Sequence, residues 1–323
     1  MSTRNIDPAW LEQPVLLATR QSALALWQAN HIRDRLRETW GKGLQVELVK
    51  VITEGDRILD RPLNLVGGKG LFVKGIEDKL LAQEVDLAVH SMKDLPGNLP
   101  PGLTITCTPE REDPRDALLG PEGGKLAKLP AGTRLGTSSL RRSALARRLN
   151  GGLKIVPLRG NVPTRIEKMK AGECDAILLA ASGLKRLGLD DQIVEHLEVE
   201  RFCPAACQGI LAIEIREDDV RMKALLQPLH HAVTGIVADA ERGFLRRLDG
   251  GCQVPMGCHA TVRSDDIVTV SGMVIDPSGR PCFIATKVGH PNDADAVGRE
   301  LAETLLRLGA NRILESISHS VPE

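Results

Sequence analysis

A single carboxylate, Asp94, stands just beyond a short stretch that reads as a strand. Residues 86–90 are mostly apolar, and the chain then becomes polar before Leu95 and Pro96 end any regular element, because the residue before proline avoids helix. In open α/β sheets, ligands bind in the crevice outside the carboxyl ends of the strands. The position therefore predicts a functional role for Asp94, although a Lys-Asp pair in a loop can also be an ordinary solvated turn.

Arginines recur at the ends of predicted strands and at the starts of predicted helices. Helix N-termini offer unpaired backbone N–H groups to anions, and guanidinium groups bind carboxylates through two parallel hydrogen bonds. The alternative is a set of ordinary surface arginines. Their shared placement in a chain of zero net charge favours a polycarboxylate site. These residues are Arg20, Arg141, Arg142, Arg159, Arg165 and Arg186.

Cys252 lies in a glycine-rich loop at 249–255 that follows a predicted helix. A reactive thiol needs exposure and a tuned pKa, and Arg246 and Arg247 are close in sequence. A buried, inert cysteine is the alternative. A zinc site could also be assembled nearby, but the ligand spacing matches neither a ribbon nor a finger, so we expect no metal. The residues available to such a site are Cys203, Cys207, Cys252, Cys258 and His259.

The composition argues against several classes of protein. Lys+Arg and Asp+Glu each total 42, so nothing indicates a charged tail for nucleic acid or membrane. Tyr is absent and only 4 Phe and 3 Trp occur, which leaves few rings to stack on bases. No apolar run approaches the roughly 20 residues that span a bilayer, and residues 1–13 carry no signal peptide. The odd number of cysteines, 7, argues for reduced thiols in a cytoplasm.

The remaining pattern predicts two similar α/β domains, whose matching ends face a cleft, and a small α+β domain. The first domain should contain strands at 15–18, 45–53, 86–90 and 103–108, with helices at 23–39 and 72–82. The second should contain strands at 133–136, 154–158 and 175–180, with helices at 140–149 and 163–170. The third should contain helices at 229–248 and 294–308 and strands at 260–263, 267–275 and 282–288.

The connections between these elements set the domain limits. Residues 111–116 are charged and rich in turn formers, which indicates a crossing between domains, and the segment ending in strand 210–215 should return to the first domain. We therefore expect domain 1 at 1–109 and 210–227, domain 2 at 110–209 and domain 3 at 228–323. The irregular segment 54–70 is expected to act as a lid. His230 and His231 should pack against or cap the helix that they open.

Five motifs together resemble the porphobilinogen deaminase (hydroxymethylbilane synthase) family, over residues 15–317. They are Val89-His-Ser-Met-Lys-Asp-Leu-Pro96, Gly136-Thr-Ser-Ser-Leu-Arg-Arg142, Leu158-Arg-Gly-Asn161, Gly183-Leu-Lys-Arg-Leu-Gly188 and Gly251-Cys-Gln-Val-Pro255. The resemblance implies a transferase that joins four porphobilinogen molecules head to tail into the linear tetrapyrrole hydroxymethylbilane and releases ammonia at each step. It also implies two α/β domains of the periplasmic-binding-protein type flanking a cleft, with a small α+β domain that carries the cysteine.

The resemblance implies a role for each candidate residue. Asp94 would be the catalytic carboxylate, and Cys252 would carry a covalent dipyrromethane primer through a thioether. The implied primer-binding residues are Lys93, Arg20, Ser22, Thr137, Ser139, Arg141, Arg142, Arg159 and Arg165. The implied substrate-binding residues are Arg20, Arg159, Arg165 and Arg186. The expected protein is a cytoplasmic monomer whose partner is porphobilinogen, with no nucleic acid and no membrane.

The implied chemistry suits these residue types. Each porphobilinogen bears an acetate and a propionate, so a growing chain accumulates negative charge that a basic cleft can hold. Loss of ammonia from porphobilinogen gives a cationic azafulvene, which an ionised Asp94 would stabilise. The sequence departs from the family pattern at Cys207, where Gly is expected, at Cys258, where Ser is common, and at Leu65, where some members have Lys.

Two alternatives belong to other classes of protein. A non-catalytic, two-lobed binding protein for a small polycarboxylate would need neither the third domain nor Cys252. A zinc hydrolase would contain stoichiometric metal. The mass of the intact chain distinguishes these alternatives from a primer-bearing enzyme.

Overall fold

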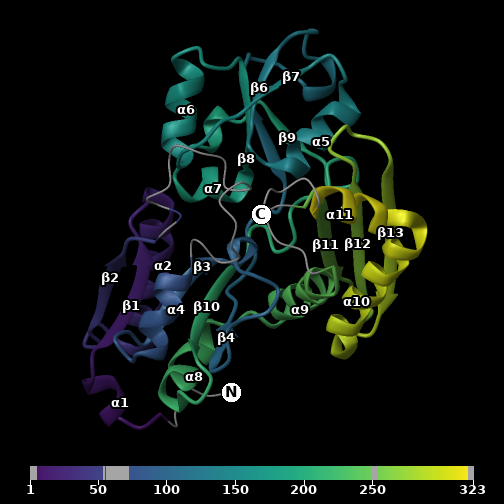
Figure 1. Ribbon diagram of the computed structural model, residues 1–323. Helices are drawn as coiled ribbons and strands as arrows, with labels where there is room; N and C mark the ends of the chain where they lie inside the picture. The colour runs from purple at the N-terminus through teal and green to yellow at the C-terminus, as the bar shows by residue number, and fades with distance from the viewer. Residues whose placement is uncertain (1–5, 54, 56–72, 249–253, 319–323) are drawn as a thin grey trace. The chain divides into compact units, whose positions relative to one another are not determined.

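A computed structural model of the 323-residue chain describes residues 6–53, 55, 73–248 and 254–318. These residues fall into two compact units, whose elements are labelled in Figure 1. The first unit holds 6–53, 55, 73–111 and 210–235, and the second holds 112–209, 236–248 and 254–318. The expected lid lies outside the described residues except for Gly55, and so do residues 249–253 of the loop that contains Cys252. The division into three domains, with limits at 109, 209 and 227, stays a prediction.

The first unit is built on a five-stranded sheet in the order β2-β1-β3-β10-β4 (Figure 1). Strands β2, β1 and β3 run parallel, whereas β10 runs antiparallel to both of its neighbours. The strands are β1 (Val15–Arg20), β2 (Val46–Val51), β3 (Leu87–Ser91), β4 (Leu103–Cys107) and β10 (Leu211–Arg216). The helices are α1 (Ala9–Glu12), α2 (Ala23–Trp40), α4 (Lys74–Leu81) and α8 (Val220–Leu226), with short 3-10 turns η3 (Met92–Asp94) and η6 (Gln227–Leu229).

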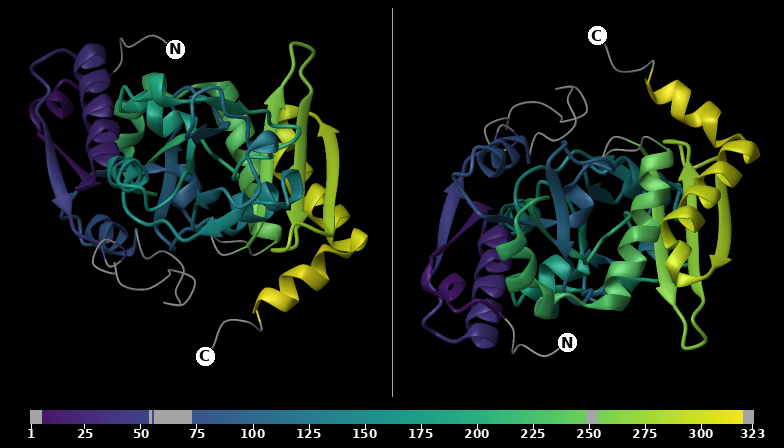
Figure 2. Two further views of the ribbon diagram at one scale, coloured as in Figure 1. Left: turned by 90° about the horizontal axis from the view of Figure 1, so that it is seen from above. Right: turned by 90° about the horizontal axis from the view of Figure 1, so that it is seen from below.

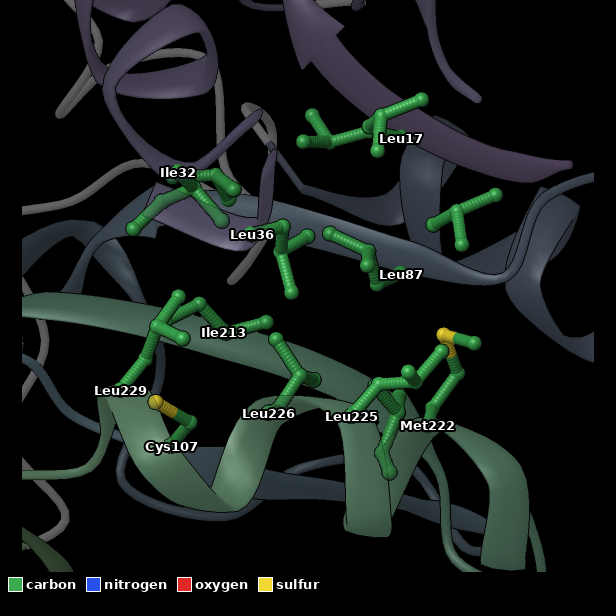
Figure 3. Close-up of a cluster of buried hydrophobic side chains, with 14 of the residues drawn as sticks. Leu17, Ile32, Leu36, Leu87, Cys107, Ile213, Met222, Leu225, Leu226 and Leu229 are labelled. Atoms are coloured by element: carbon green, nitrogen blue, oxygen red, sulfur yellow. The ribbon is translucent and has the colours of Figure 1, made fainter. Parts of the chain in front are cut away.

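Helices cover both faces of this sheet, because side chains alternate between the faces along each strand. On one face, α2 and α8 pack against the sheet through a mainly aliphatic core (Figure 3). That core includes Leu17, Ile32, Leu36, Leu87, Ile213, Met222 and Leu226. On the other face, Ile76 and Leu80 of α4 pack against Ala18 and Ala88. Strands β1 and β3 are therefore held from both sides.

The second unit contains a matching five-stranded sheet in the order β7-β6-β8-β5-β9. Again three parallel strands are followed by one that runs antiparallel to its neighbours, here β5. The strands are β5 (Asp116–Leu119), β6 (Arg134–Gly136), β7 (Lys154–Val156), β8 (Ala176–Ala180) and β9 (Glu195–Leu197). The helices are α5 (Leu140–Leu149), α6 (Val162–Lys170) and α7 (Ala181–Arg186), with 3-10 turns η4 (Leu126–Lys128) and η5 (Asp190–Gln192). The expected α/β fold class is confirmed.

A three-stranded antiparallel sheet completes the second unit, with α10 packed against β12 and β13 (Figure 2). Met273 and Ile275 of β12 share a buried cluster with Leu118 and Phe202, so this sheet and the five-stranded sheet have one continuous core. The elements are β11 (Met256–Val262), β12 (Val268–Ile275), β13 (Cys282–Gly289), most of α9 (Ala232–Arg247), α10 (Ala294–Leu305) and α11 (Asn311–Ser318), with η7 (Pro291–Asp293) and a π-helical turn, η8 (Leu306–Ala310).

Several elements differ from the sequence-based expectation. Residue 116, expected in a charged crossing, begins the fully buried strand β5. The residues after β8, where no helix was expected, form helix α7. The helix expected from 229 begins at Ala232, where the ring nitrogen Nδ1 of His231 accepts from the backbone N–H of Thr234 at 3.4 Å. The expected capping role of this histidine is thus confirmed, and it replaces the usual Ser or Asp.

Three buried titratable groups lie in or next to β3, the strand that leads to Asp94: His90 in β3 itself, Glu214 in the paired strand β10 and Glu77 in α4. His90 Nε2 and Glu214 Oε2 are 3.0 Å apart, and both side chains are almost fully buried. Glu77 is 6% exposed, and its Oε1 has no hydrogen-bond partner among the described residues. Burial raises the pKa of Glu77 from 4.5 to about 7, and the nearby Glu214 carboxylate adds to this effect while His90 opposes it.

Glu77→Gln is expected to flatten the pH dependence of folding stability. The native state binds a proton at Glu77 more firmly than the unfolded chain, so the resulting stability is complete below pH 4.5 and is lost as the pH rises through about 7. The loss should be on the order of 3 kcal/mol. Urea unfolding at pH 4.5 and pH 8 measures it, with the exposed Glu38→Gln as control. Equal pH dependence in wild type and Glu77→Gln would contradict this prediction.

Candidate functional site

In the first unit, four of the predicted site residues lie at one edge of the sheet. Strands β1 and β3 are parallel neighbours, with Leu17 opposite Leu87, so both end at the same edge. Arg20 is the last residue of β1, and Ser22 is the N-cap of α2, accepting from the N–H of Ala25 at 3.3 Å. The other two residues are Lys93 and Asp94, in the turn η3 that follows β3. All four side chains are partly exposed.

The backbone on both sides of Asp94 is firmly held. The N–H of Met92 donates to the carbonyl oxygen of Ile210 at 2.9 Å, and the N–H of Leu95 closes the turn on the Met92 carbonyl at 3.1 Å. One residue earlier, Ser91 Oγ accepts from Nε2 of the buried Gln28 at 2.8 Å. The partly exposed carboxylate therefore extends from a backbone that is fixed by a strand, a tight turn and a neighbouring helix. Such a position suits a group that must meet a reacting atom precisely.

In the second unit, the remaining described site residues also gather at the carboxyl edge of parallel strands. Strand β6 pairs in register with β7 and β8, so all three end at the same side of the sheet. Thr137 and Ser139 follow β6, and Ser139 caps helix α5 by accepting from the N–H of Arg142. Residues that follow the other two strands complete the set. They are Arg159 after β7, Arg165 in the first turn of α6, and Arg186 at the end of α7, which follows β8.

Arg141 and Arg142 form a buried ion cluster with Asp116. Arg141 Nη1 donates to Asp116 Oδ2 at 2.6 Å, while Arg142 Nε and Nη2 approach Oδ1 at 2.8 and 2.7 Å. Asp116 is fully buried, and the two arginines are 5% and 6% exposed. Burial alone would raise the pKa of the Asp116 carboxyl, but the two guanidinium groups outweigh it and hold that pKa well below its usual range. The Asp116 carboxyl is therefore ionised at neutral pH.

Backbone carbonyls orient two other arginines at this edge. Arg165 Nε donates to the carbonyl oxygen of Gly160 at 2.7 Å, and Arg186 Nη2 donates to that of Gly209 at 2.7 Å. Burial lowers the pKa of Arg186 to about 10, although the carboxylate of Glu112 acts against this shift. Arg186 thus keeps its positive charge at neutral pH. These carbonyls fix the direction of each guanidinium without neutralising it.

The cysteines outside the expected primer loop are in environments unlike that of a reactive thiol. Burial raises the pKa of Cys203 to about 12, which makes its thiolate scarce at neutral pH. Cys207 is buried and has a φ of 62°, a left-handed conformation that suits the Gly expected from the family. In the part of the chain that the structure describes, no group of three or more His, Cys, Asp or Glu side chains could hold a metal ion. Cys252 lies outside those residues.

Sequence reasoning missed Asp116 and its neighbour Gln208, whose Nε2 approaches Asp116 Oδ1 at 3.2 Å. A signal was available, because Arg141 and Arg142 occupy the first turn of a helix, where the helix dipole disfavours cations. Two arginines at that end need a nearby anion, either from the protein or from a ligand. Asp116 could have been considered because it directly precedes the apolar residues Ala117 to Leu119.

Comparison with known proteins identifies the family. The model described as "Porphobilinogen deaminase, dipyromethane cofactor binding domain" matches residues 15–224, and the model of the C-terminal domain of the same enzyme matches residues 236–307. The chain belongs to the porphobilinogen deaminase family. The predicted resemblance is confirmed, and so is the predicted dipyrromethane cofactor.

Curated relatives agree with this membership of the porphobilinogen deaminase family. A porphobilinogen deaminase from Syntrophotalea carbinolica is 52% identical over 301 residues, which cover 93% of this chain and 95% of the relative. Another from Syntrophobacter fumaroxidans is 49% identical over 306 residues, which cover 95% of this chain and 98% of the relative.

No described helix has both the length and the apolar character required to cross a membrane.

Arg141→Leu or Arg142→Leu is expected to give protein that lacks the primer and is less stable. Each change removes a cation from the predicted primer site and leaves Asp116 with one guanidinium partner, at a cost on the order of 2–5 kcal/mol. Intact mass and urea unfolding measure the two effects. The control is Arg263→Leu, because Arg263 is exposed, pairs with Asp265 at 3.1 Å, and such surface pairs contribute about 1 kcal/mol or less. Primer-loaded, fully active protein from both variants would contradict this assignment.

Proposed function

We propose that the chain performs hydroxymethylbilane synthesis with Asp94 as its catalytic carboxylate and the arginines of the second unit as its carboxylate-binding groups. The observation that carries this proposal is the clustering of the predicted residues at strand ends. A partly exposed carboxylate follows β3 in the first unit. In the second unit, polar and cationic side chains follow β6, β7 and β8. These are the positions at which α/β sheets bind ligands.

The second unit also fits a polycarboxylate primer. The first turn of α5, where the helix dipole favours anions, carries Arg141 and Arg142. Arg159 precedes α6, and Arg165 lies in its first turn. Guanidinium groups that are already oriented bind carboxylates with little further loss of freedom. When bound through Cys252, the dipyrromethane supplies the pyrrole carbon to which the next unit is joined. The residues of the chain hold and orient the acetate and propionate groups.

Asp94 would act on porphobilinogen as an electrostatic stabiliser and proton carrier. Departure of ammonia leaves positive charge on the substrate, and a fixed carboxylate nearby lowers the energy of that charge. The same carboxylate can accept or return a proton when it lies within hydrogen-bond reach. Lys93, the preceding residue, and Arg20, at the neighbouring strand end, would bind carboxylates beside it. A cytoplasmic location and the absence of a nucleic-acid or membrane partner are proposed from the composition, and a monomer is proposed from the family resemblance.

The direct test follows purified protein incubated with porphobilinogen. We expect ammonia and a linear tetrapyrrole to form in a ratio of about four to one, as the reaction requires. The alternative function, a two-lobed binding protein for a small polycarboxylate, predicts saturable binding of porphobilinogen without release of ammonia. That second outcome would overturn the proposed function.

A further inference from the structure

The first turn of α5 contains an electrostatic arrangement that the helix alone would disfavour. The aligned peptide dipoles place a partial positive charge at a helix N-terminus, yet Arg141 and Arg142 are the second and third residues of α5. Both side chains are buried, so water cannot screen them effectively. Ser139 supplies the ordinary cap for this helix, and it carries no charge. A negative group must therefore accompany the arginines, and Asp116 provides it.

The carboxylate of Asp116 contacts both guanidinium groups. Oδ2 accepts from Arg141 Nη1 at 2.6 Å, and Oδ1 accepts from Arg142 Nε at 2.8 Å and from Arg141 Nη2 at 3.3 Å. Each arginine is held at a second point by a backbone carbonyl. Arg141 Nη1 donates to Cys203 O at 2.8 Å, and Arg142 Nη1 donates to Leu178 O at 3.0 Å. Because a guanidinium is planar, two such contacts determine the direction in which the group faces.

The carboxylate itself has little freedom. Asp116 is the first residue of β5, where it pairs with Ala180 of β8 and with Leu197 of β9, and its side chain is fully buried. Gln208 Nε2 also donates to Asp116 Oδ1, at 3.2 Å, and to the carbonyl of Pro114, at 2.8 Å. Two guanidinium charges and one carboxylate leave the three charged side chains with a net charge of +1. The cluster is thus rigid and still attracts an anion.

We propose that Asp116 is a positioning residue, which orients Arg141 and Arg142 to receive the carboxylates of the primer. This inference rests on the proposed function, because it takes these two arginines to be primer-binding groups. Asp116 acts through the arginines and does not itself touch the primer, because its carboxylate would repel the carboxylates of the primer. Gln208 supports Asp116 with a neutral amide, which holds the carboxylate without cancelling its charge.

The first experiment removes the charge and keeps the shape, with Asp116→Asn. Apoprotein is prepared from cells that cannot make porphobilinogen, and the rate at which it gains the primer from added porphobilinogen is followed by intact mass. We expect loading to slow about 10- to 100-fold, the usual effect of removing a group that orients a ligand-binding side chain. The matched control is Asp113→Asn. Asp113 has a side chain 7% exposed and pairs with Arg115 at 2.8 Å, so it tests loss of a similar ion pair in the same segment.

The second experiment moves the charge to the other side of the same hydrogen bond. In Asp116→Asn/Gln208→Glu, the carboxylate and the amide exchange places. The total charge and the elemental composition of the chain are unchanged. If Asp116 acts by orienting the arginines, the double variant should regain at least about tenfold in loading rate over Asp116→Asn. If the role of Asp116 is purely structural, the rate of primer loading in each variant should depend only on its thermal stability, whichever residue carries the charge.

The possible outcomes separate this inference from the proposed function. If wild-type apoprotein gains no primer, the proposed function fails. If wild type loads and folded Asp116→Asn loads as fast as Asp113→Asn, only the positioning role is overturned. If Asp116→Asn does not fold, the double variant Asp116→Asn/Gln208→Glu tests the positioning role. A folded double variant that loads within about tenfold of wild type supports the positioning role, and a folded double variant that does not load overturns it.

Discussion

Asp94→Asn is expected to lower the rate of ammonia release from porphobilinogen by at least about a thousandfold, while porphobilinogen binding changes little. Asparagine keeps the size of the side chain and much of its hydrogen-bonding capacity, but it has no charge and cannot act as a base. If Asp94 mainly stabilises the positive charge that develops as ammonia leaves, its contribution is realised in the transition state rather than in the bound substrate. Removing one such group typically costs about a hundred- to a thousandfold in rate. The additional loss of proton transfer extends the effect.

The variant should fold, because Asp94 occupies a turn whose hydrogen bonds come from the backbone of Met92, Leu95 and Ile210. Primer assembly uses the same chemistry as the reaction, so Asp94→Asn must first be loaded with preformed tetrapyrrole. A single-turnover assay on loaded protein then reports the chemical step. The exposed carboxylate of Asp78, in the same unit, supplies the control Asp78→Asn. Loaded Asp94→Asn that releases ammonia within tenfold of wild type would remove Asp94 from the mechanism.

Cys252→Ala is expected to abolish both the primer and the activity. A thioether to the primer requires a sulfur atom at this position, and alanine offers no nucleophile. The matched control is Cys282→Ala, which removes a thiol from β13 of the second unit, where burial raises the thiol pKa. That control should keep the primer and nearly full activity. Full activity in Cys252→Ala, with the primer on another cysteine, would show that the attachment site has been misassigned.

Much of the fold could be predicted because local signals and tertiary structure agree. Helix α2 begins directly after Ser22, as its N-cap and apolar spacing predict, and helix α5 begins directly after Ser139. Asp94, for which a catalytic role stays a prediction, was expected just beyond a strand, and it lies in the turn that follows β3. In each case, a few consecutive residues contain the information, and the surrounding protein reinforces it.

The unpredicted parts depend on contacts between distant segments. Asp116 looks like the last residue of a charged turn, because the arginines that stabilise it are 25 and 26 residues further along the chain. Helix α7 has only six residues and no side-chain N-cap, so its formation depends on packing against the rest of the unit. Its first four residues are buried. When the partner residue is distant in sequence, the local sequence of a buried charged residue resembles that of a solvated loop. The sequence of a short buried helix likewise resembles that of a strand end.

The environment of Arg141 and Arg142 also depends on contacts with distant segments. Their sequence position predicted a role in binding anions, and the structure adds that the two side chains are already fixed by a protein carboxylate. A site assembled in advance in this way loses less freedom when it binds a charged ligand. It also makes the arginines part of the stability of the second unit, so stability and primer content must be measured together in any variant of this cluster.

If this enzyme works from a covalently attached primer, the intact, active protein must carry that primer, and mass spectrometry detects it. We expect a mass above that of the bare 323-residue chain by two linked pyrrole units, with the addition mapped to the peptide containing Cys252. Fully active protein whose mass equals that of the bare chain would contradict covalent attachment of the primer.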